Sequence, residues 1–207
     1  MKKLPLTHIF ITSKVPSKKL MIILHGRGDT AAGFSFLPPY LDIDEMNYIL
    51  LDAPNDFLDG YSWYDLPPNQ HAGILHSRDI LTQTLDILFE EQFDAGESFL
   101  FGFSQGSLLV FEFGARYHKV LAGYIGISGY IYEAHTLLEE MNPEVKKARW
   151  LCTHGREDEL LPYDVSKAQV DILQKGGFDV EFIPYNKSHT MADDELRMLE
   201  AWIKAGL

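Results

Sequence analysis

The chain has 207 residues, of which 46% are hydrophobic and 23% are charged, and its formal net charge is −12. This composition is typical of a soluble globular protein that can bury a substantial core. The negative charge argues against broad contact with nucleic acid or an anionic lipid surface. No apolar run approaches the ~20 residues that span a bilayer, so we expect no integral membrane association. The single cysteine, Cys152, excludes an internal disulfide.

The N-terminal segment, residues 1–19, begins with two lysines after the initiating methionine, as a signal peptide does. Its apolar stretch is short, however, and polar residues interrupt it at Thr7, His8, Thr12 and Ser13. No small-residue cleavage site follows it. We therefore expect a mature strand here and a cytoplasmic protein.

Short apolar runs rich in β-branched and aromatic residues recur along the chain. They predict seven strands, over residues 8–12, 20–25, 47–53, 98–103, 121–128, 148–154 and 179–185. Most are nearly continuous apolar segments, as expected for parallel strands that helices cover on both faces. The first run lacks that character and fits an edge strand.

Helical patterns lie between the later strands, over residues 77–93, 107–118, 163–177 and 192–206. The second of these is apolar almost all round and should be a buried, central helix. The third ends in two glycines, a C-cap signal, and the fourth carries three acidic residues in its first turn, where the helix dipole favours them. The residues expected to form the buried faces of the other three are Leu81, Thr84, Leu85, Leu88, Val165, Val170, Leu173, Leu196, Leu199 and Ile203.

The alternation of strands and helices predicts one doubly wound α/β domain over residues 1–207, with a mostly parallel sheet. In such folds ligands bind beyond the carboxyl ends of the strands. Functional residues are therefore expected in the segments that directly follow the predicted strands.

Residues 102–106 read Gly-Phe-Ser-Gln-Gly, which matches the pattern G-x-S-x-G. A chain of this length would show the pattern by accident about one time in fifteen. Here a strand leads directly into the serine and a helix leads out, which is the setting of a nucleophile elbow. Ser104 is therefore the predicted nucleophile, and the alternative is an ordinary Gly-Ser turn.

A serine nucleophile needs a base, and the base needs a carboxylate that orients it. The elbow architecture predicts the chain order Ser, Asp or Glu, then His. Asp158 lies in a loop just after a predicted strand, with Glu157 and Glu159 beside it as alternatives, and His189 lies in the loop after the last strand. All of these loops belong to the edge of the sheet that carries Ser104.

The other histidines are weaker candidates for the base. Four of them lie in helical or loop segments that do not directly follow a predicted strand: His71, His76, His118 and His135. His154 ends the strand before Asp158 and is expected to be a structural neighbour of the site.

A tetrahedral intermediate also needs hydrogen-bond donors for its oxyanion. The backbone N–H of Gln105 is the first candidate, and the N–H of Arg27 is the second, because Gly26 and Gly28 free that early loop. The loop is a poor phosphate site, since no G-K-[ST] follows it. The absence of His-Glu-x-x-His and Cys-x-x-Cys motifs argues against a dedicated metal site.

Five motifs, LHGRGD (24–29), YSWYD (61–65), GFSQGS (102–107), HGREDELLP (154–162) and SHT (188–190), together resemble the phospholipase/carboxylesterase family of serine hydrolases. That family includes acyl-protein thioesterases and small bacterial carboxylesterases. The motifs follow the family's order and span nearly the whole chain.

The resemblance implies an α/β-hydrolase fold without a large cap domain. It implies Ser104, Asp158 and His189 as the catalytic triad and the N–H groups of Arg27 and Gln105 as the oxyanion hole. It also favours Asp158 over its acidic neighbours. Finally, it implies that the segment around Trp63, with Leu66, Pro67 and Pro68, forms part of the wall of an acyl-binding groove. The alternative is that this segment is an aromatic-proline surface loop.

The chain departs from the family pattern at three positions, Arg27, Ser107 and Ser188, where the family commonly has an apolar residue, a glycine and a glycine. None of these changes removes a catalytic atom. The side chain of Arg27 could bring positive charge to the site, which gives the hypothesis that it favours shorter or acidic substrates.

The leading hypothesis is a serine carboxylesterase that acts on a small-molecule ester or acyl substrate and needs no cofactor. The runner-up is a thioesterase or lysophospholipase that acts on acyl-protein or lysolipid. A third hypothesis, from another class, is a non-catalytic hydrolase-fold binding module. Dienelactone-type hydrolysis is disfavoured, because the elbow carries serine instead of cysteine. A homodimer is compatible with the sequence, but nothing in it identifies one.

Overall fold

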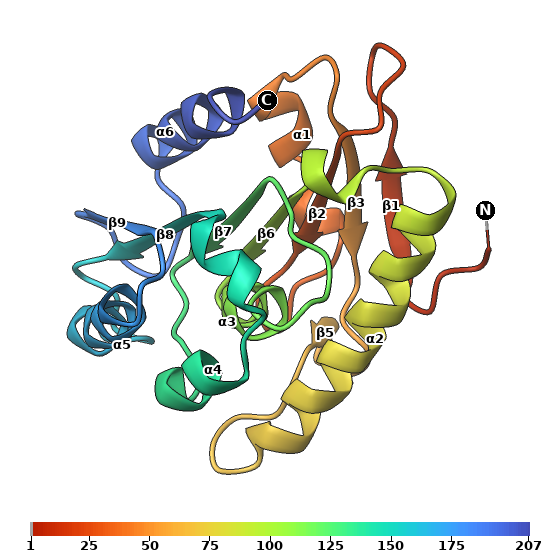
Figure 1. Cartoon of the computed structure of the whole chain (residues 1–207). Coiled ribbons are helices and arrows are strands. Elements are labelled where there is room, and N and C mark those ends of the chain that lie inside the picture. The colour runs from red at the N-terminus through yellow and green to blue at the C-terminus, as the bar shows by residue number, and fades with distance from the viewer. Residues whose placement is uncertain (1) are drawn as a thin grey trace.

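The computed structural model describes residues 2–207 and contains a seven-stranded sheet of order β1-β3-β2-β6-β7-β8-β9 (Figure 1). Edge strand β1 runs antiparallel to β3, and the remaining neighbours pair in parallel. The strands are β1 (His8–Ile11), β2 (Leu20–Leu24), β3 (Asn47–Leu51), β6 (Phe99–Phe103), β7 (Gly123–Ile127), β8 (Arg149–Gly155) and β9 (Val180–Tyr185). All seven predicted strands are confirmed, with ends that move by one or two residues.

Helices cover both faces of this sheet (Figure 1). One face carries α1 (Leu37–Leu41) and α6 (Asp193–Lys204), and the other carries α2 (Gln70–Glu91), α3 (Gln105–Gly114), α4 (Ala134–Glu140) and α5 (Tyr163–Lys175). Strand side chains alternate between the two layers: Ile22 of β2 packs in the core beneath α2 and α3, whereas Ile23 packs in the core beneath α1 and α6. This two-sided burial explains why most of the strands are continuous apolar runs. Among residues 2–207, no helix has both the length and the apolar character that crossing a membrane would need.

The four predicted helices are present, with three corrections. Helix α3 spans Gln105–Gly114, so it ends four residues before the predicted end at residue 118. Helix α2 begins at Gln70, seven residues before the predicted start, because Gly73 lets this first part pack on Tyr64, whose Cβ would be 2.8 Å from a Cβ at position 73. Val165 of α5 is 52% exposed and does not belong to the buried face of that helix, unlike Val170 and Leu173. The other residues assigned to buried faces are buried.

Three short elements were not predicted from the sequence. Helices α1 and α4 span only five and seven residues, too few to show a helical period. The third is a hairpin formed by β4 (Asn55–Phe57) and β5 (Gly60–Ser62), which lies next to the residues that bound the candidate site. Its strands have three residues each, below the length at which alternation is recognisable.

Candidate active site

Ser104 occupies a strained turn between β6 and α3. Its backbone has φ 54° and ψ −113°, a region that non-glycine residues seldom adopt, and its N–H donates to the carbonyl of Ile127 at 2.9 Å. Two glycines make the turn sterically feasible. A Cβ at Gly102 would lie 2.2 Å from the carbonyl oxygen of Gly106, and a Cβ at Gly106 would lie 2.2 Å from that of Leu24. The G-x-S-x-G segment therefore has the strand–turn–helix geometry of a nucleophile elbow.

His189 lies in the loop between β9 and α6 and contacts both other members of the predicted triad. Its Nε2 is 3.0 Å from Ser104 Oγ, and its Nδ1 is 2.8 Å from Asp158 Oδ2. The ring also lies against Phe103, with 5.1 Å between the ring centroids. Residues separated by as many as 85 positions in the chain thus form one hydrogen-bonded series, which the geometry of a serine nucleophile and its base requires.

Asp158 is held by the backbone of the residues that follow it. Its Oδ1 accepts from the N–H groups of Leu160 and Leu161, at 3.0 and 2.9 Å, so that Oδ2 is left to face His189. The Asp158 side chain is fully buried, whereas the alternatives Glu157 and Glu159 are exposed.

His154 is a buried neighbour of Asp158, as the sequence predicts. Its Nε2 lies 2.8 Å from the carbonyl of Leu161 and 3.5 Å from Asp158 Oδ2. Burial lowers the pKa of His154, and the nearby Leu161 carbonyl and Asp158 only partly offset this effect. A neutral His154 is therefore the form that fits beside the carboxylate at neutral pH.

The two predicted oxyanion donors, Arg27 and Gln105, border the same cavity as Ser104. Gln105 is the first residue of α3, so its N–H has no acceptor within the helix. Its side chain is fixed by three hydrogen bonds: Oε1 accepts from Ser62 Oγ and Trp63 N–H, and Nε2 donates to the carbonyl of Tyr64. The segment after β5 thereby locks the start of α3 in place.

A cavity of about 440 Å³ opens beside Ser104 and His189. It is lined by Gly26, Arg27, Asp29, Phe57, Tyr64, Leu66, Phe103, Ser104, Gln105, Tyr130, Leu160, Leu161 and His189. Apart from the triad, the donors and Asp29, its walls are mainly apolar and aromatic. This Ser104 cavity could therefore hold an acyl or other apolar group against the serine hydroxyl.

Leu66 lines the Ser104 cavity as expected, but Trp63 does not. Trp63 is fully buried, and its indole N–H donates to the carbonyl of His25 at 2.9 Å. Its role is to tie the loop that carries Arg27 to the segment after β5, and the neighbouring Tyr64 is the aromatic residue on the wall. Pro67 and Pro68 are also absent from the lining residues.

Several lining residues were not identified from the sequence. Leu160 and Leu161 belong to the motif that carries Asp158. Two adjacent leucines in an otherwise polar loop could have indicated an apolar wall beside the acid. Phe57 and Tyr130 gave no such signal, because the tertiary fold alone brings the β4–β5 hairpin and the loop after β7 to the cavity.

Arg27 lines this cavity, and its side chain lacks an ion-pair partner within residues 2–207. Its guanidinium carbon lies 3.7 Å from the ring centroid of Phe57, and its Nε is buried without a hydrogen-bond partner. Asp29 lines the cavity too, but its Oδ1 accepts from the N–H of Thr30. Within the described part of the chain, Arg27 is therefore a cation on this cavity that no carboxylate contacts directly.

Comparison with known proteins shows which family the chain is similar to. Residues 7–207 match the family model described as Phospholipase/Carboxylesterase. A probable carboxylesterase from Oryza sativa subsp. japonica is 26% identical over an alignment that covers 91% of this chain and 77% of the relative. Acyl-protein thioesterase 1 from Schizosaccharomyces pombe is 27% identical and covers 81% of each chain.

A solved structure gives the same result for the fold. The crystal structure of esterase PE8 superposes with a TM-score of 0.89, at 24% identity, and covers 98% of this chain and 99% of that one. The expected α/β-hydrolase fold, with its mostly parallel sheet and without a large cap, is confirmed. Because the family model spans nearly the whole sequence, from the first strand to the last residue, this chain belongs to the phospholipase/carboxylesterase family.

Proposed function

We propose that this protein is a serine hydrolase that cleaves carboxylic esters through Ser104, His189 and Asp158. The observation that carries the proposal is the series of hydrogen bonds from Ser104 Oγ to His189 Nε2 (3.0 Å) and from His189 Nδ1 to Asp158 Oδ2 (2.8 Å). The strained backbone of Ser104 supports it, because such strain is typical of a functional residue.

The chemistry follows from the positions of these groups. Ser104 Oγ attacks the ester carbonyl while His189 Nε2 accepts its proton, and Asp158 stabilises the resulting imidazolium. The carbonyl oxygen becomes an oxyanion, for which the N–H groups of Arg27 and Gln105 are the proposed donors. Collapse of the intermediate breaks the ester C–O bond, and His189 returns the proton to the departing alcohol.

The second half of the reaction repeats these steps with water. His189 removes a proton from water, the hydroxide attacks the acyl-Ser104 ester, and collapse releases the carboxylic acid and restores Ser104. Every proton transfer is accounted for by His189, so the mechanism calls for no cofactor.

Thioester or lysolipid hydrolysis is the second candidate. The 27% sequence identity with an acyl-protein thioesterase and the apolar walls of the Ser104 cavity favour this second candidate. The same triad would act, and only the leaving group differs. Comparing kcat/KM for O-esters and S-esters with the same acyl chain, together with a lysolipid, separates the candidates.

A fluorophosphonate probe tests the catalytic proposal directly. We expect covalent modification at Ser104, located by mass spectrometry of the peptide, with no modification in Ser104→Ala and a strongly reduced rate in His189→Ala. His118→Ala, at an exposed histidine whose contacts are with Asp86 and Tyr117 and not with the triad, is the matched control and should label like the wild type. A folded wild-type protein that does not label would refute the proposal and favour the binding-module alternative.

A further inference from the structure

A buried ion pair lies two residues from His189. Lys187, in the loop between β9 and α6, contacts both carboxylate oxygens of Glu195, in the first turn of α6, at 2.7 and 2.6 Å. The two side chains are 3% and 0% exposed. The sequence places Glu195 among residues that a helix dipole favours, and gives no indication that its carboxylate is buried.

The hydrogen bonds of this pair close the loop around His189. Lys187 Nζ donates to the carbonyl of Thr190 at 2.7 Å, so the residues on either side of His189 are joined. Glu195 Oε2 accepts from the N–H of Ala192 at 3.1 Å, which joins the end of the same loop to α6. The backbone on both sides of His189 is therefore fixed through one ion pair.

The pair also fixes the loop relative to the sheet. Lys187 Nζ donates to Ser128 Oγ at 3.1 Å, directly after β7, and Thr153 Oγ1 of β8 donates to Glu195 Oε1 at 2.5 Å. Both serine and threonine hydroxyls are buried. These hydrogen bonds thus connect the ion pair to β7 and β8, two central strands that the rest of the core holds rigid.

The backbone of Lys187 sets the distance between the loops of Asp158 and His189. Its carbonyl accepts from the N–H of Glu157 at 3.1 Å. Gly155 packs so closely against it that a Cβ there would be 2.3 Å from the Lys187 oxygen. A movement of Lys187 would therefore change the separation of the two triad members directly.

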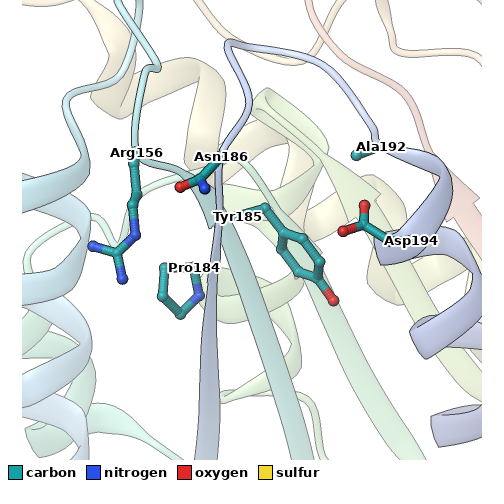
Figure 2. A pocket seen from close by; sticks show the side chains of 6 residues that line it. All are labelled: Arg156, Pro184, Tyr185, Asn186, Ala192 and Asp194. Atoms are coloured by element: carbon teal, nitrogen blue, oxygen red, sulfur yellow. The ribbon is translucent and has the colours of Figure 1, made fainter.

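A second cavity borders this loop. Figure 2 shows the loop running from Asn186 to Ala192 beside a second cavity, of about 410 Å³, with Tyr185 and Asp194 along its walls. The lining residues are Arg156, Pro184, Tyr185, Asn186, Ala192 and Asp194. The ion pair therefore acts together with the Glu157–Lys187 backbone hydrogen bond in holding a loop that borders a cavity.

We propose that Lys187 and Glu195 are positioning residues that keep His189 within hydrogen-bond reach of both Ser104 and Asp158. The inference rests on the proposed function, because it assigns the pair a role in the same reaction. A buried ion pair contributes little net stability compared with well-packed apolar residues, so a role in geometry fits its contacts better than a role in stability.

The principal test is the double variant Lys187→Met/Glu195→Gln, which removes both charges without leaving one unpaired. We expect kcat and the fluorophosphonate labelling rate to fall 10- to 100-fold, because a misplaced base slows proton transfer. KM should change less than threefold, since neither residue lines the Ser104 cavity. Thermal unfolding measured alongside establishes that the variant is folded.

The matched control is a second ion pair within the fold. Arg116, which follows the end of α3, and Glu112 on α3 are 2.8 Å apart, with side chains 9% and 3% exposed. Arg116→Met/Glu112→Gln should lower the unfolding temperature without a comparable loss of kcat. Equal losses of kcat in the two double variants would show a general effect of stability and would overturn the proposal.

A conservative pair of variants covers the case in which the double variant does not fold. Lys187→Arg and Glu195→Asp keep both charges but alter the reach of each side chain, and we expect them to fold with a kcat reduced three- to tenfold. Folded variants with wild-type kcat and labelling rate would overturn the proposal. If the wild-type protein neither hydrolyses esters nor reacts with the fluorophosphonate, the proposed function itself is refuted. The wild type is measured first, so this outcome is distinguished from a failure of the positioning proposal.

Discussion

At the residue scale, the two oxygens of Asp158 have different tasks. Oδ1 is occupied by two backbone N–H groups, and Oδ2 alone faces Nδ1 of His189. This arrangement requires the imidazole to carry its proton on Nδ1, which leaves Nε2 free to accept the proton of Ser104. The tautomer of the base is thus set by the backbone of the two leucines that follow the acid.

Asp158→Asn should therefore inactivate the protein without unfolding it. The amide oxygen will take the position of Oδ1, since the two N–H donors need an acceptor, and the NH2 group will face His189 Nδ1. Nδ1 must then accept, so the proton moves to Nε2 and the base is lost. We expect kcat on a 4-nitrophenyl ester to fall about 10³- to 10⁴-fold. Glu159→Gln, at the exposed neighbouring acid, is the control and should keep the wild-type kcat. A decrease in kcat of less than tenfold in Asp158→Asn would contradict the assignment.

Arg27 supports a prediction about substrate preference. Arg27 lines the Ser104 cavity, and its guanidinium lies over the ring of Phe57, another lining residue, without a carboxylate partner in the described chain. We infer that it is available to an anionic group on the substrate. We expect Arg27→Leu to lower the kcat/KM ratio of 4-nitrophenyl hemisuccinate to 4-nitrophenyl butyrate about tenfold, equivalent to about 1.4 kcal/mol.

Arg156→Leu, at an exposed arginine on the second cavity, is the control for this ratio. The ratio cancels any general effect of position 27 on oxyanion binding, because both esters pass through a tetrahedral oxyanion with the same 4-nitrophenolate leaving group. If the two variants gave the same ratio as the wild type, the hypothesis of an acidic substrate would be abandoned.

At the scale of elements, the site depends on how closely β6 and α3 approach β2. The first turn of α3 begins directly at the serine, and Gly106 brings that turn against the carbonyl of Leu24 at the end of β2. The contact is with the backbone of a central strand, which has no freedom to move aside. The helix therefore starts at the one place where its N-terminus can face the cavity.

Gly106→Ala tests this approach. The new Cβ would lie 2.2 Å from the Leu24 oxygen, so α3 must shift away from the sheet. We expect the free energy of unfolding in urea to fall by about 1–3 kcal/mol or more, together with a lower labelling rate at Ser104. Gly96→Ala is the matched control, because a Cβ there meets its nearest atom at 3.4 Å. Wild-type stability in Gly106→Ala would show that the elbow is not tightly packed.

At the scale of the whole molecule, two buried histidines link stability to pH. Burial lowers the pKa of both His25 and His154. The neutral form of His25 is fixed by its contacts: Nδ1 is 2.6 Å from the carbonyl of Gly26, and Nε2 accepts from the N–H of Ala53 at 3.0 Å. Protonation of Nε2 would break the second bond. These histidines lie at the ends of β2 and β8, within the framework of the site.

The sign of the effect follows from proton binding. A histidine whose pKa is lowered by folding binds fewer protons in the folded than in the unfolded state below about pH 6.5, so stability falls as pH falls. At pH 5.5 we therefore expect a lower free energy of unfolding than at neutral pH. Urea unfolding at pH 7.5 and 5.5 measures it. The difference in the free energy of unfolding between the two pH values should be smaller in His154→Gln than in the wild type. His135→Gln, at an exposed histidine, should show the same difference as the wild type.

The sequence by itself was sufficient for the sheet and for the candidate triad. Continuous apolar runs predict the strands because parallel strands are buried on both faces, and the chain order of Ser104, Asp158 and His189 after three strands predicts that they meet at one edge. Periodicity failed where elements were short, as in α1, α4 and the β4–β5 hairpin. It also failed at the start of α2, where packing on Tyr64 extends the helix beyond its apolar pattern.

Only the tertiary structure decided which side chains surround the serine. Trp63 and Tyr64 are adjacent aromatic residues, and the sequence gives no reason to choose between them; the hydrogen bonds of Trp63 turn it into the core and leave Tyr64 on the cavity. The burial of Lys187 with Glu195 was equally invisible, because charged residues near a helix start are usually solvated. Local patterns report which backbone an isolated segment prefers, whereas the burial of a polar side chain depends on partners that other segments supply.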